Sequence, residues 1–141
     1  MHTKHSVSTR IAKYLFVVII FMGIISSLSL LVMASNKSDA EAINISGSLR
    51  MQSYRLLTEM ERSPNTVEQN LVRYQDSLNA NVLLTVQNQL FAPSGIKASY
   101  QKILQRWMMM SDFARVHQIE KYHAELKSYV QDVDDFVLEL Q

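Results

Sequence analysis

The sequence predicts an all-α protein, in which an N-terminal transmembrane helix continues into an antiparallel up-down four-helix bundle. Four observations lead to this fold class. An uncharged apolar run occupies residues 14–34, and later segments repeat apolar side chains at alternating spacings of four and three residues. Only three glycines and two prolines occur among 141 residues, which leaves few turns and favours long helices. No segment alternates with a period of two for long enough to predict a strand.

The run from Tyr14 to Ala34 has the length of a membrane-spanning helix. Its 21 residues extend about 31 Å at about 1.5 Å per residue, which matches the hydrocarbon core of a bilayer. The preceding stretch carries Lys4, Arg10 and Lys13 but no acid. The positive-inside rule therefore places residues 1–13 in the cytoplasm. We expect a single pass through the bacterial inner membrane, with residues 35–141 in the periplasm if the source is Gram-negative.

A cleaved signal peptide is the alternative interpretation of the apolar run. Val32-Met33-Ala34 has small or modest side chains where a signal peptidase requires them. Against this, the run is longer than the ~7–15 residues of a usual signal peptide core. No helix breaker separates it from the segment that follows, so we favour an uncleaved anchor.

Four helices are expected after the membrane. The first continues to about Arg62, and Ser63 and Pro64 then provide an N-cap and a first helical position for the second. The second weakens at residues 79–81, and residues 91–95 form a loop. Residues 82–90 fit either a continued helix or a short irregular piece. The third helix covers about 94–115, and the fourth runs from near Gln118 to the end.

Each of the last three helices carries one apolar stripe that predicts its buried face. The stripes are Val67, Leu71, Tyr74 and Leu78; Ile96, Tyr100, Ile103, Trp107, Met110 and Ala114; and Ile119, Tyr122, Leu126, Tyr129, Val133, Phe136 and Leu140. Short loops between such helices imply up-down order, so the fourth helix returns toward the membrane. Its stripe continues to Leu140, which leads us to expect an N-terminal part of a longer protein.

Charge and composition argue against several functions. Residues 35–141 carry 11 basic and 13 acidic side chains, which is not the profile of a nucleic-acid binder. The absence of cysteine excludes disulfides and thiolate metal sites. His117 and His123 are six residues apart, whereas metal pairs on one helix need a spacing of three or four. The consecutive methionines 108–110 point about 100° apart and cannot converge on one ion.

No catalytic residue, metal or other cofactor is expected, because the chain contains no glycine-rich phosphate loop and no nucleophile motif. Asp132, Asp134 and Asp135 are interpreted as a solvated or dimer-facing acidic patch.

Arg50 is the residue that points most directly to a function. It lies on a 4-3 stripe of the first helix whose members are Asn36, Ala40, Ile43, Gly47, Arg50, Tyr54 and Leu57. If this stripe forms a dimer interface, two copies of Arg50 face each other. At a separation of ~7 Å and an effective dielectric of ~20 they repel by roughly 2 kcal/mol. A small anion between them would turn repulsion into attraction, and assembly of two chains would thus create a ligand site.

The alternative for Arg50 is a structural salt bridge to an acid of another helix, or a side chain that extends to water. Gly47 favours the ligand site, because glycine inside a helix costs ~1 kcal/mol relative to alanine. That cost makes sense where a backbone or a ligand must approach closely. Arg55 lies about 140° round the helix from Arg50, and we expect it to pair with Glu59 at i and i+4.

The stretch from Asp39 to Arg55 (DAEAINISGSLRMQSYR) closely resembles the P-box of nitrate/nitrite sensor histidine kinases of the NarX/NarQ type. The match is almost continuous over 17 residues directly after the membrane span. The short basic start and the last helix, from Tyr129 to Gln141, are also similar to that family. Residues 63–117 support the resemblance only by their helix pattern.

The resemblance implies a homodimer of periplasmic bundles that binds nitrate or nitrite between the two first helices. Arg50 matches the family arginine that holds the anion, once from each protomer, and Gly47 matches the glycine whose backbone lies against it. Further pocket-lining candidates are Ile43, Ser46, Met51 and Tyr54. Signalling would occur by displacement of the first helix against the fourth.

The family's kinase core is not among these residues, so autophosphorylation and ATP binding are not assigned to them. A response regulator would be reached only through such a core. A chemoreceptor-like or pilus-associated helical ectodomain that acts by protein interaction is the alternative function. The preference between nitrate and nitrite is open at this point.

Overall fold

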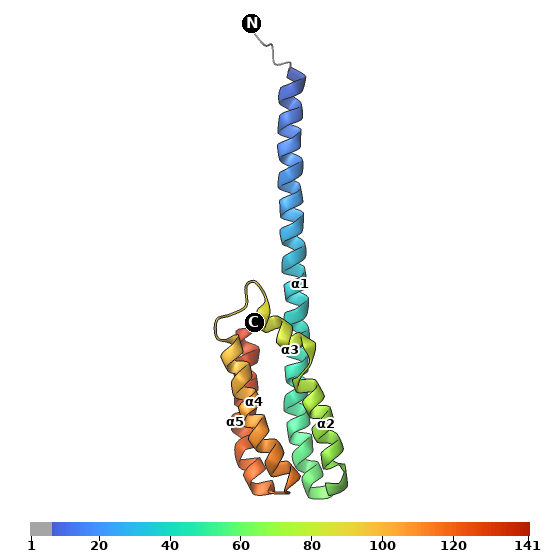
Figure 1. The fold of residues 1–141 in the computed structure, drawn as a ribbon, viewed down its shortest axis with the longest axis vertical. Helices are drawn as coiled ribbons and strands as arrows, with labels where there is room; N and C mark the ends of the chain where they lie inside the picture. The colour runs from blue at the N-terminus through green and yellow to red at the C-terminus, as the bar shows by residue number, and fades with distance from the viewer. Residues whose placement is uncertain (1–6) are drawn as a thin grey trace. The chain divides into compact units, whose positions relative to one another are not determined.

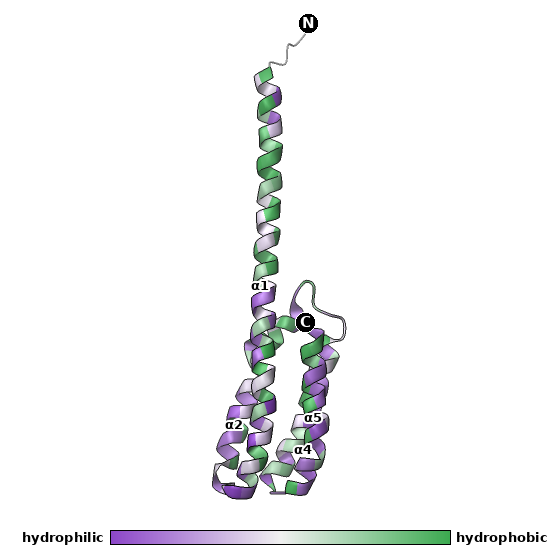
Figure 2. Ribbon diagram, turned by 180° about the vertical axis from the view of Figure 1, so that it is seen from behind, coloured by the Kyte–Doolittle hydropathy of each residue, from purple (hydrophilic) through white to green (hydrophobic). Residues whose placement is uncertain are grey.

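The computed structural model describes residues 7–141, and residues 1–6 of the predicted cytoplasmic stretch 1–13 lie outside the described part. The chain divides into two compact units, Met1–Asn36 and Lys37–Gln141. The first described element, α1, is a helix of 56 residues from Val7 to Arg62. Its apolar part is long enough to cross a membrane and has no buried residue, and Figure 2 shows that hydrophobic residues predominate along this part of the helix.

The second unit contains an up-down bundle, as predicted. The part of α1 from Lys37 onward packs with α2 (Val67–Leu78), α4 (Ile96–Arg115) and α5 (Ile119–Glu139). Figure 1 shows that α2 and α5 run back toward the end of the bundle at which this part of α1 begins. No strand occurs among residues 7–141. The all-α, four-helix class is therefore confirmed.

The connections between these helices refine the predicted boundaries. A 3-10 turn, η1 (Pro64–Thr66), follows Ser63, so Ser63 precedes this turn and does not cap the second helix; α2 begins only at Val67. For residues 82–90 the sequence allowed either a continued helix or an irregular piece. The structure places them in the short helix α3 (Asn81–Thr85), a 3-10 turn η2 (Val86–Asn88) and the start of a loop. His117 lies in the turn before α5, with a positive φ of 54°.

The apolar stripes predicted for α2, α4 and α5 form the core. All four members on α2 and all six on α4 are buried, while Ile119 and Leu140 at the two ends of the α5 stripe are partly buried. At the centre, the rings of Tyr74 and Trp107 stack with centroids 3.6 Å apart. The Tyr74 hydroxyl forms a hydrogen bond with that of Tyr129. Burial raises the pKa of Tyr74 well above its ordinary value.

Helix α1 buries a different face from the one that its apolar stripe suggests. The buried residues are Ala42, Ser46, Leu49, Ser53, Leu56 and Met60. This face lies about 100° round the helix from the stripe that contains Gly47 and Arg50. Two serines are tolerated in it because each hydroxyl donates to a backbone carbonyl of its own helix, Ser46 to Ala42 and Ser53 to Arg50. The Arg50 stripe is consequently left at the margin of the bundle and partly exposed.

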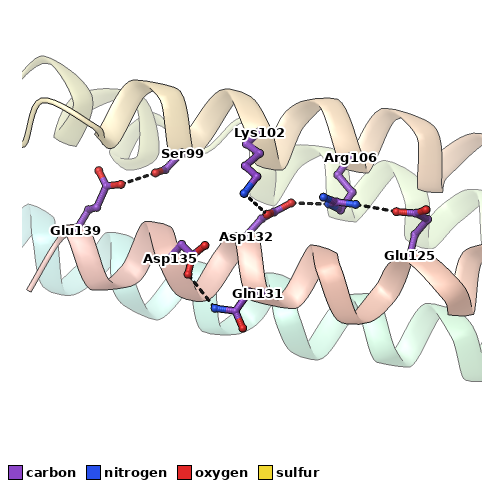
Figure 3. Close-up of polar contacts among 8 residues, drawn as sticks. All are labelled: Ser99, Lys102, Arg106, Glu125, Gln131, Asp132, Asp135 and Glu139. Carbon is purple, nitrogen blue, oxygen red and sulfur yellow. Dashed lines mark hydrogen bonds and ion pairs between the residues drawn. The ribbon is translucent and has the colours of Figure 1, made fainter.

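A charged network joins α4 to α5 and contradicts the predicted acidic patch at Asp132. This residue is only 3 % exposed and accepts contacts from Arg106 at 2.5 Å and Lys102 at 3.0 Å. Arg106 also contacts Glu125 at 2.7 Å. Figure 3 shows the two cations of α4 converging on the α5 carboxylates. The hydrogen bond that Arg106 donates to Asp132 is the main cause of the raised pKa of Arg106.

Candidate functional site

Arg50 lies on α1 in a half-exposed position and forms an ion pair with Asp134 of α5. The Nη1 group donates to Oδ1 of Asp134. The Arg50 side chain retains 40 % of its accessible area and the Asp134 side chain 37 %. Both charges therefore remain partly hydrated, and such a pair contributes less than ~1 kcal/mol to the stability of the bundle.

Gly47 lies one turn before Arg50, and its missing side chain is not required by the single chain. A Cβ atom placed on Gly47 would have one close neighbour outside its own backbone, the Nη2 atom of Arg50 at 3.7 Å. This distance is an ordinary van der Waals contact, so alanine would fit. Since glycine within a helix costs ~1 kcal/mol relative to alanine, the packing of one protomer offers no compensation for it.

The other predicted lining residues lie on two faces of α1. Met51 and Tyr54 are 65 % and 52 % exposed, and Ile43, more than two turns earlier on α1, is half-buried. The exposed Met51 and Tyr54 provide apolar side chains on the same side of α1 as Arg50. Ser46 differs, because its side chain is buried in the bundle and its hydroxyl donates to the Ala42 carbonyl. The structure thus brings Arg50, Gly47, Met51 and Tyr54 to the outer side of α1 and turns Ser46 toward the core.

Hydrogen bonds donated by side chains connect α1 to its neighbours near Arg50. The Tyr122 hydroxyl of α5 donates to the backbone carbonyl of Ser53 at 2.8 Å. Gln52 donates to the Ser77 hydroxyl of α2 at 3.2 Å. Burial raises the pKa of Tyr122, which keeps this hydroxyl a donor. The backbones of α4 and α5 approach each other closely along their length, whereas that of α1 does not approach its neighbours in this way. Helix α1 is therefore held mainly through side chains.

Arg55 does not belong to the group of residues around Arg50. Its Nε donates to Glu59 at 2.9 Å, which confirms the predicted pair at i and i+4. Glu59 also accepts a hydrogen bond from Asn70 of α2. These residues line a small cavity of about 90 Å³ between α1 and α2. Arg55 is therefore part of the α1–α2 contact.

The arrangement at Arg50 is suited to binding an oxyanion. A guanidinium carries five N–H donors in one plane, and the contact to Asp134 uses the Nη1 side. The remaining donors can serve a second acceptor, and Met51 and Tyr54 on the same side of α1 are exposed. In the described part of the chain, residues 7–141, no cluster of three metal-ligating side chains is found.

Asp134 is the site residue that sequence reasoning placed only in a general acidic patch. Its partner was not identifiable, because the two residues are separated by 84 positions and the helix register determines which acid faces Arg50. A signal was nevertheless present, since a cation on an apolar stripe requires a counter-ion. The interpretation of Arg50 as a salt-bridged residue anticipated an acid on another helix without naming it.

Comparison with known proteins identifies relatives over the entire chain. The family model of PilJ, the type IV pili methyl-accepting chemotaxis transducer N-terminal region, matches residues 31–136. The sensor protein NarQ homolog of Haemophilus influenzae is 62 % identical over 141 residues, which are 100 % of this chain and 25 % of the relative. The nitrate/nitrite sensor protein NarQ of Escherichia coli is 33 % identical with the same coverage.

These relatives confirm the resemblance to NarX/NarQ-type sensors that the stretch from Asp39 to Arg55 indicated. The chain spans about a quarter of the length of the curated relatives that it matches. That quarter is the sensor part, and residues 7–141 accordingly hold a long apolar helix and a bundle and do not include a kinase core.

Proposed function

The chain belongs to the type IV pili methyl-accepting chemotaxis transducer N-terminal family, and from its likeness to NarQ sensors we propose that it is the nitrate/nitrite-sensing module of a membrane-bound sensor histidine kinase. In this proposal residues 14–34 cross the inner membrane and residues 35–141 are periplasmic. Two chains form a homodimer along the Arg50 stripe of α1. The anion binds between the two Arg50 guanidinium groups, and the whole protein passes the signal to a response regulator.

The observation that carries the proposal is the combination of Arg50 and Gly47 on a face that the bundle leaves open. The bundle core of one protomer uses the neighbouring face of α1, and nothing in one protomer requires the glycine. A second helix or a ligand that approaches the backbone at Gly47 would require it. The exposed Met51 and Tyr54 beside it supply apolar surface for such an approach.

Nitrate fits the symmetry of this arrangement. It is planar and can lie on a two-fold axis along one N–O bond, which leaves two equivalent oxygens. Each guanidinium then donates charge-assisted hydrogen bonds to one side of the anion. The apolar surroundings favour a weakly hydrated anion over sulfate. Nitrite, bicarbonate and a small carboxylate satisfy the same geometry, and the likeness to a nitrate/nitrite sensor is what favours the nitrogen oxyanions.

Asp134 gives the site two states. Without the anion, Asp134 is the group that neutralises the charge of Arg50, and the two arginines repel each other across the interface. With the anion bound, the guanidinium groups approach the two-fold axis, and α1 shifts relative to α5. The anion biases this equilibrium only by its difference in affinity for the two states. Because α1 is continuous from Val7 to Arg62, a small displacement would reach the membrane segment.

The experiment that tests the site is calorimetric titration of nitrate into the purified membrane-anchored dimer. Arg50→Ala should abolish detectable binding, while helix content and thermal stability stay close to those of the unchanged protein, because the ion pair is half-exposed. Arg55→Ala is the matched control, since it removes an arginine five residues away on the same helix and should leave nitrate affinity unchanged. Undiminished affinity in Arg50→Ala would exclude this site.

A protein-interaction role is the second candidate, favoured by the family match to chemotaxis transducers of type IV pili. In that role the bundle would respond to a protein partner, and Arg50–Asp134 would be a structural pair between α1 and α5. Absence of binding by any small nitrogen oxyanion to the dimer, with Arg50 still paired to Asp134, would support it.

A further inference from the structure

We propose that the loop of residues 89–95, with Leu90 and Phe91 at its tip, inserts into the membrane surface and holds one end of the bundle against the bilayer. Leu90 is 85 % exposed and Phe91 77 %. These are the two largest exposed fractions among the large apolar side chains of residues 7–141, above those of the apolar run itself. Isolated exposed leucines are ordinary, but two adjacent large apolar residues at a loop tip indicate a contact with something apolar.

The loop lies at the end of the bundle that must be close to the bilayer. Helix α2 returns toward the end at which Lys37 begins the second unit, and Figure 1 shows the loop before α4 at that same end, beside the C-terminus. Lys37 follows Ala34, the last residue of the apolar run, by three positions. Three residues span at most ~10 Å even when fully extended. Chain connectivity therefore limits this end to the vicinity of the membrane surface.

Charge in the sequence around the loop suits a phospholipid surface. No aspartate or glutamate occurs from residue 77 to residue 111, and Lys97 follows the loop in an exposed position on the first turn of α4. An apolar tip next to a cation is the pattern of a segment that lies in the headgroup region, where apolar groups enter by ~5–10 Å. Acids are nevertheless present at this end on the other helices, at Asp39, Glu41 and Glu139.

The opposite end of the bundle differs from this pattern. There, the turn between α1 and α2 contains Ser63, Pro64, Asn65 and Thr66. The turn between α4 and α5 contains His117 and Gln118. Val116, 63 % exposed, stands between polar residues there. The two adjacent apolar residues thus occur at the end connected to the membrane segment, where a bilayer is the partner within reach.

The absence of cysteine from the sequence makes the test direct. Single nitroxide labels are attached at Phe91→Cys, Leu90→Cys and, as the matched control at the far end, Val116→Cys, in the chain reconstituted into phosphatidylethanolamine/phosphatidylglycerol vesicles. Collision rates with oxygen, which concentrates in lipid, are compared with those of a water-soluble nickel chelate. A fourth label at Leu28→Cys reports on the apolar run itself.

The proposal expects labels at 90 and 91 to favour oxygen over the nickel chelate, as the label at 28 does, whereas the label at 116 favours the chelate. Accessibility at 90 and 91 equal to that at 116 would overturn it, and so would exclusion of both reagents, which would mean that protein covers the tip. A label at 28 in water would refute the membrane anchor as well.

A bimane label at position 91, quenched by lipids brominated near the headgroup, checks the result independently. Because no measurement uses nitrate, failure of the loop contact and failure of the Arg50 site are distinguishable.

Discussion

Two arginine–aspartate contacts in this protein use the same chemistry in different surroundings. Arg106 and Asp132 join α4 to α5, and the Asp132 side chain is 3 % exposed. Arg50 and Asp134 join α1 to α5, and their side chains are 40 % and 37 % exposed. The first carboxylate has a second cation, Lys102, and the first arginine has a second acid, Glu125.

The difference indicates which contact is structural and which can change with a ligand. A buried carboxylate that loses its cations cannot rehydrate without opening the core, so the α4–α5 pair must remain intact. A half-exposed pair exchanges its partner for water or for another anion at small cost. The close backbone packing of α4 against α5 agrees with this division, since α1 is attached mainly through side chains. In the proposed mechanism, the α4–α5 hairpin would be the fixed reference against which α1 moves.

Among the substitutions that test this comparison, removal of the buried carboxylate should have the largest effect, and the effect should be on stability. Asp132→Ala removes the buried carboxylate that Lys102 and Arg106 share at the α4–α5 contact. We expect a loss of about 3 kcal/mol in the free energy of unfolding, at the low end for a broken buried pair because Arg106 keeps Glu125 and both cations keep some contact with water. Thermal or urea denaturation followed by circular dichroism measures it. A loss as small as that of Asp134→Ala, measured alongside, would show that burial does not distinguish the two pairs.

Arg50→Lys should be the next largest effect, and it should appear in binding. Lysine keeps the charge but has no planar fork for an oxyanion, so nitrate affinity should fall by roughly 30-fold or more, about 2 kcal/mol. Stability should change by less than ~1 kcal/mol because the pair is half-exposed. Titration calorimetry on the dimer checks the first value and denaturation the second. Retention of full affinity would mean that the site needs only a positive charge.

Gly47→Ala should affect stability and binding in opposite directions. The free energy of unfolding should rise by ~0.5–1 kcal/mol, because alanine favours the helix and its Cβ fits within one protomer. Nitrate affinity should fall, since the methyl group would occupy space beside the Arg50 guanidinium. At Gly23, the other glycine of α1, a methyl group would meet no atom within 4 Å beyond its own helix backbone, and Gly23→Ala serves as the control that should leave affinity unchanged. A parallel gain or loss in both properties of Gly47→Ala would contradict the assignment.

Asp134→Asn should produce the smallest change. The amide oxygen still accepts a hydrogen bond from Arg50, but the negative charge that competes with an incoming anion is removed. We expect nitrate affinity to rise a few-fold, by ~1 kcal/mol or less at this exposure, with little change in stability. Calorimetry at low and high salt measures it, because the gain should diminish as salt screens the charge. Weaker binding would instead mean that the carboxylate positions the guanidinium for the anion.

Much of the fold could be derived from residue patterns. The uncharged run of residues 14–34 is long enough for a bilayer, and the 4-3 spacing of Tyr74, Trp107 and Tyr129 on their helices predicts the residues that meet in the core. Helix periodicity is a local property, so these features need no knowledge of neighbouring helices. The pair of Arg55 and Glu59 was predictable for the same reason, since both residues lie on one helix.

The tertiary structure decided the features that depend on which helices face each other. Periodicity marked the stripe of Gly47 and Arg50, but the bundle buries the neighbouring face of α1, with Leu49 and Leu56, and leaves that stripe at its margin. Likewise, three nearby aspartates look equivalent along the chain, yet the register of α5 buries Asp132 against α4 and directs Asp134 to Arg50. Residues two positions apart on a helix point about 200° apart. Their surroundings, and with them their roles, are therefore set only when the helices pack.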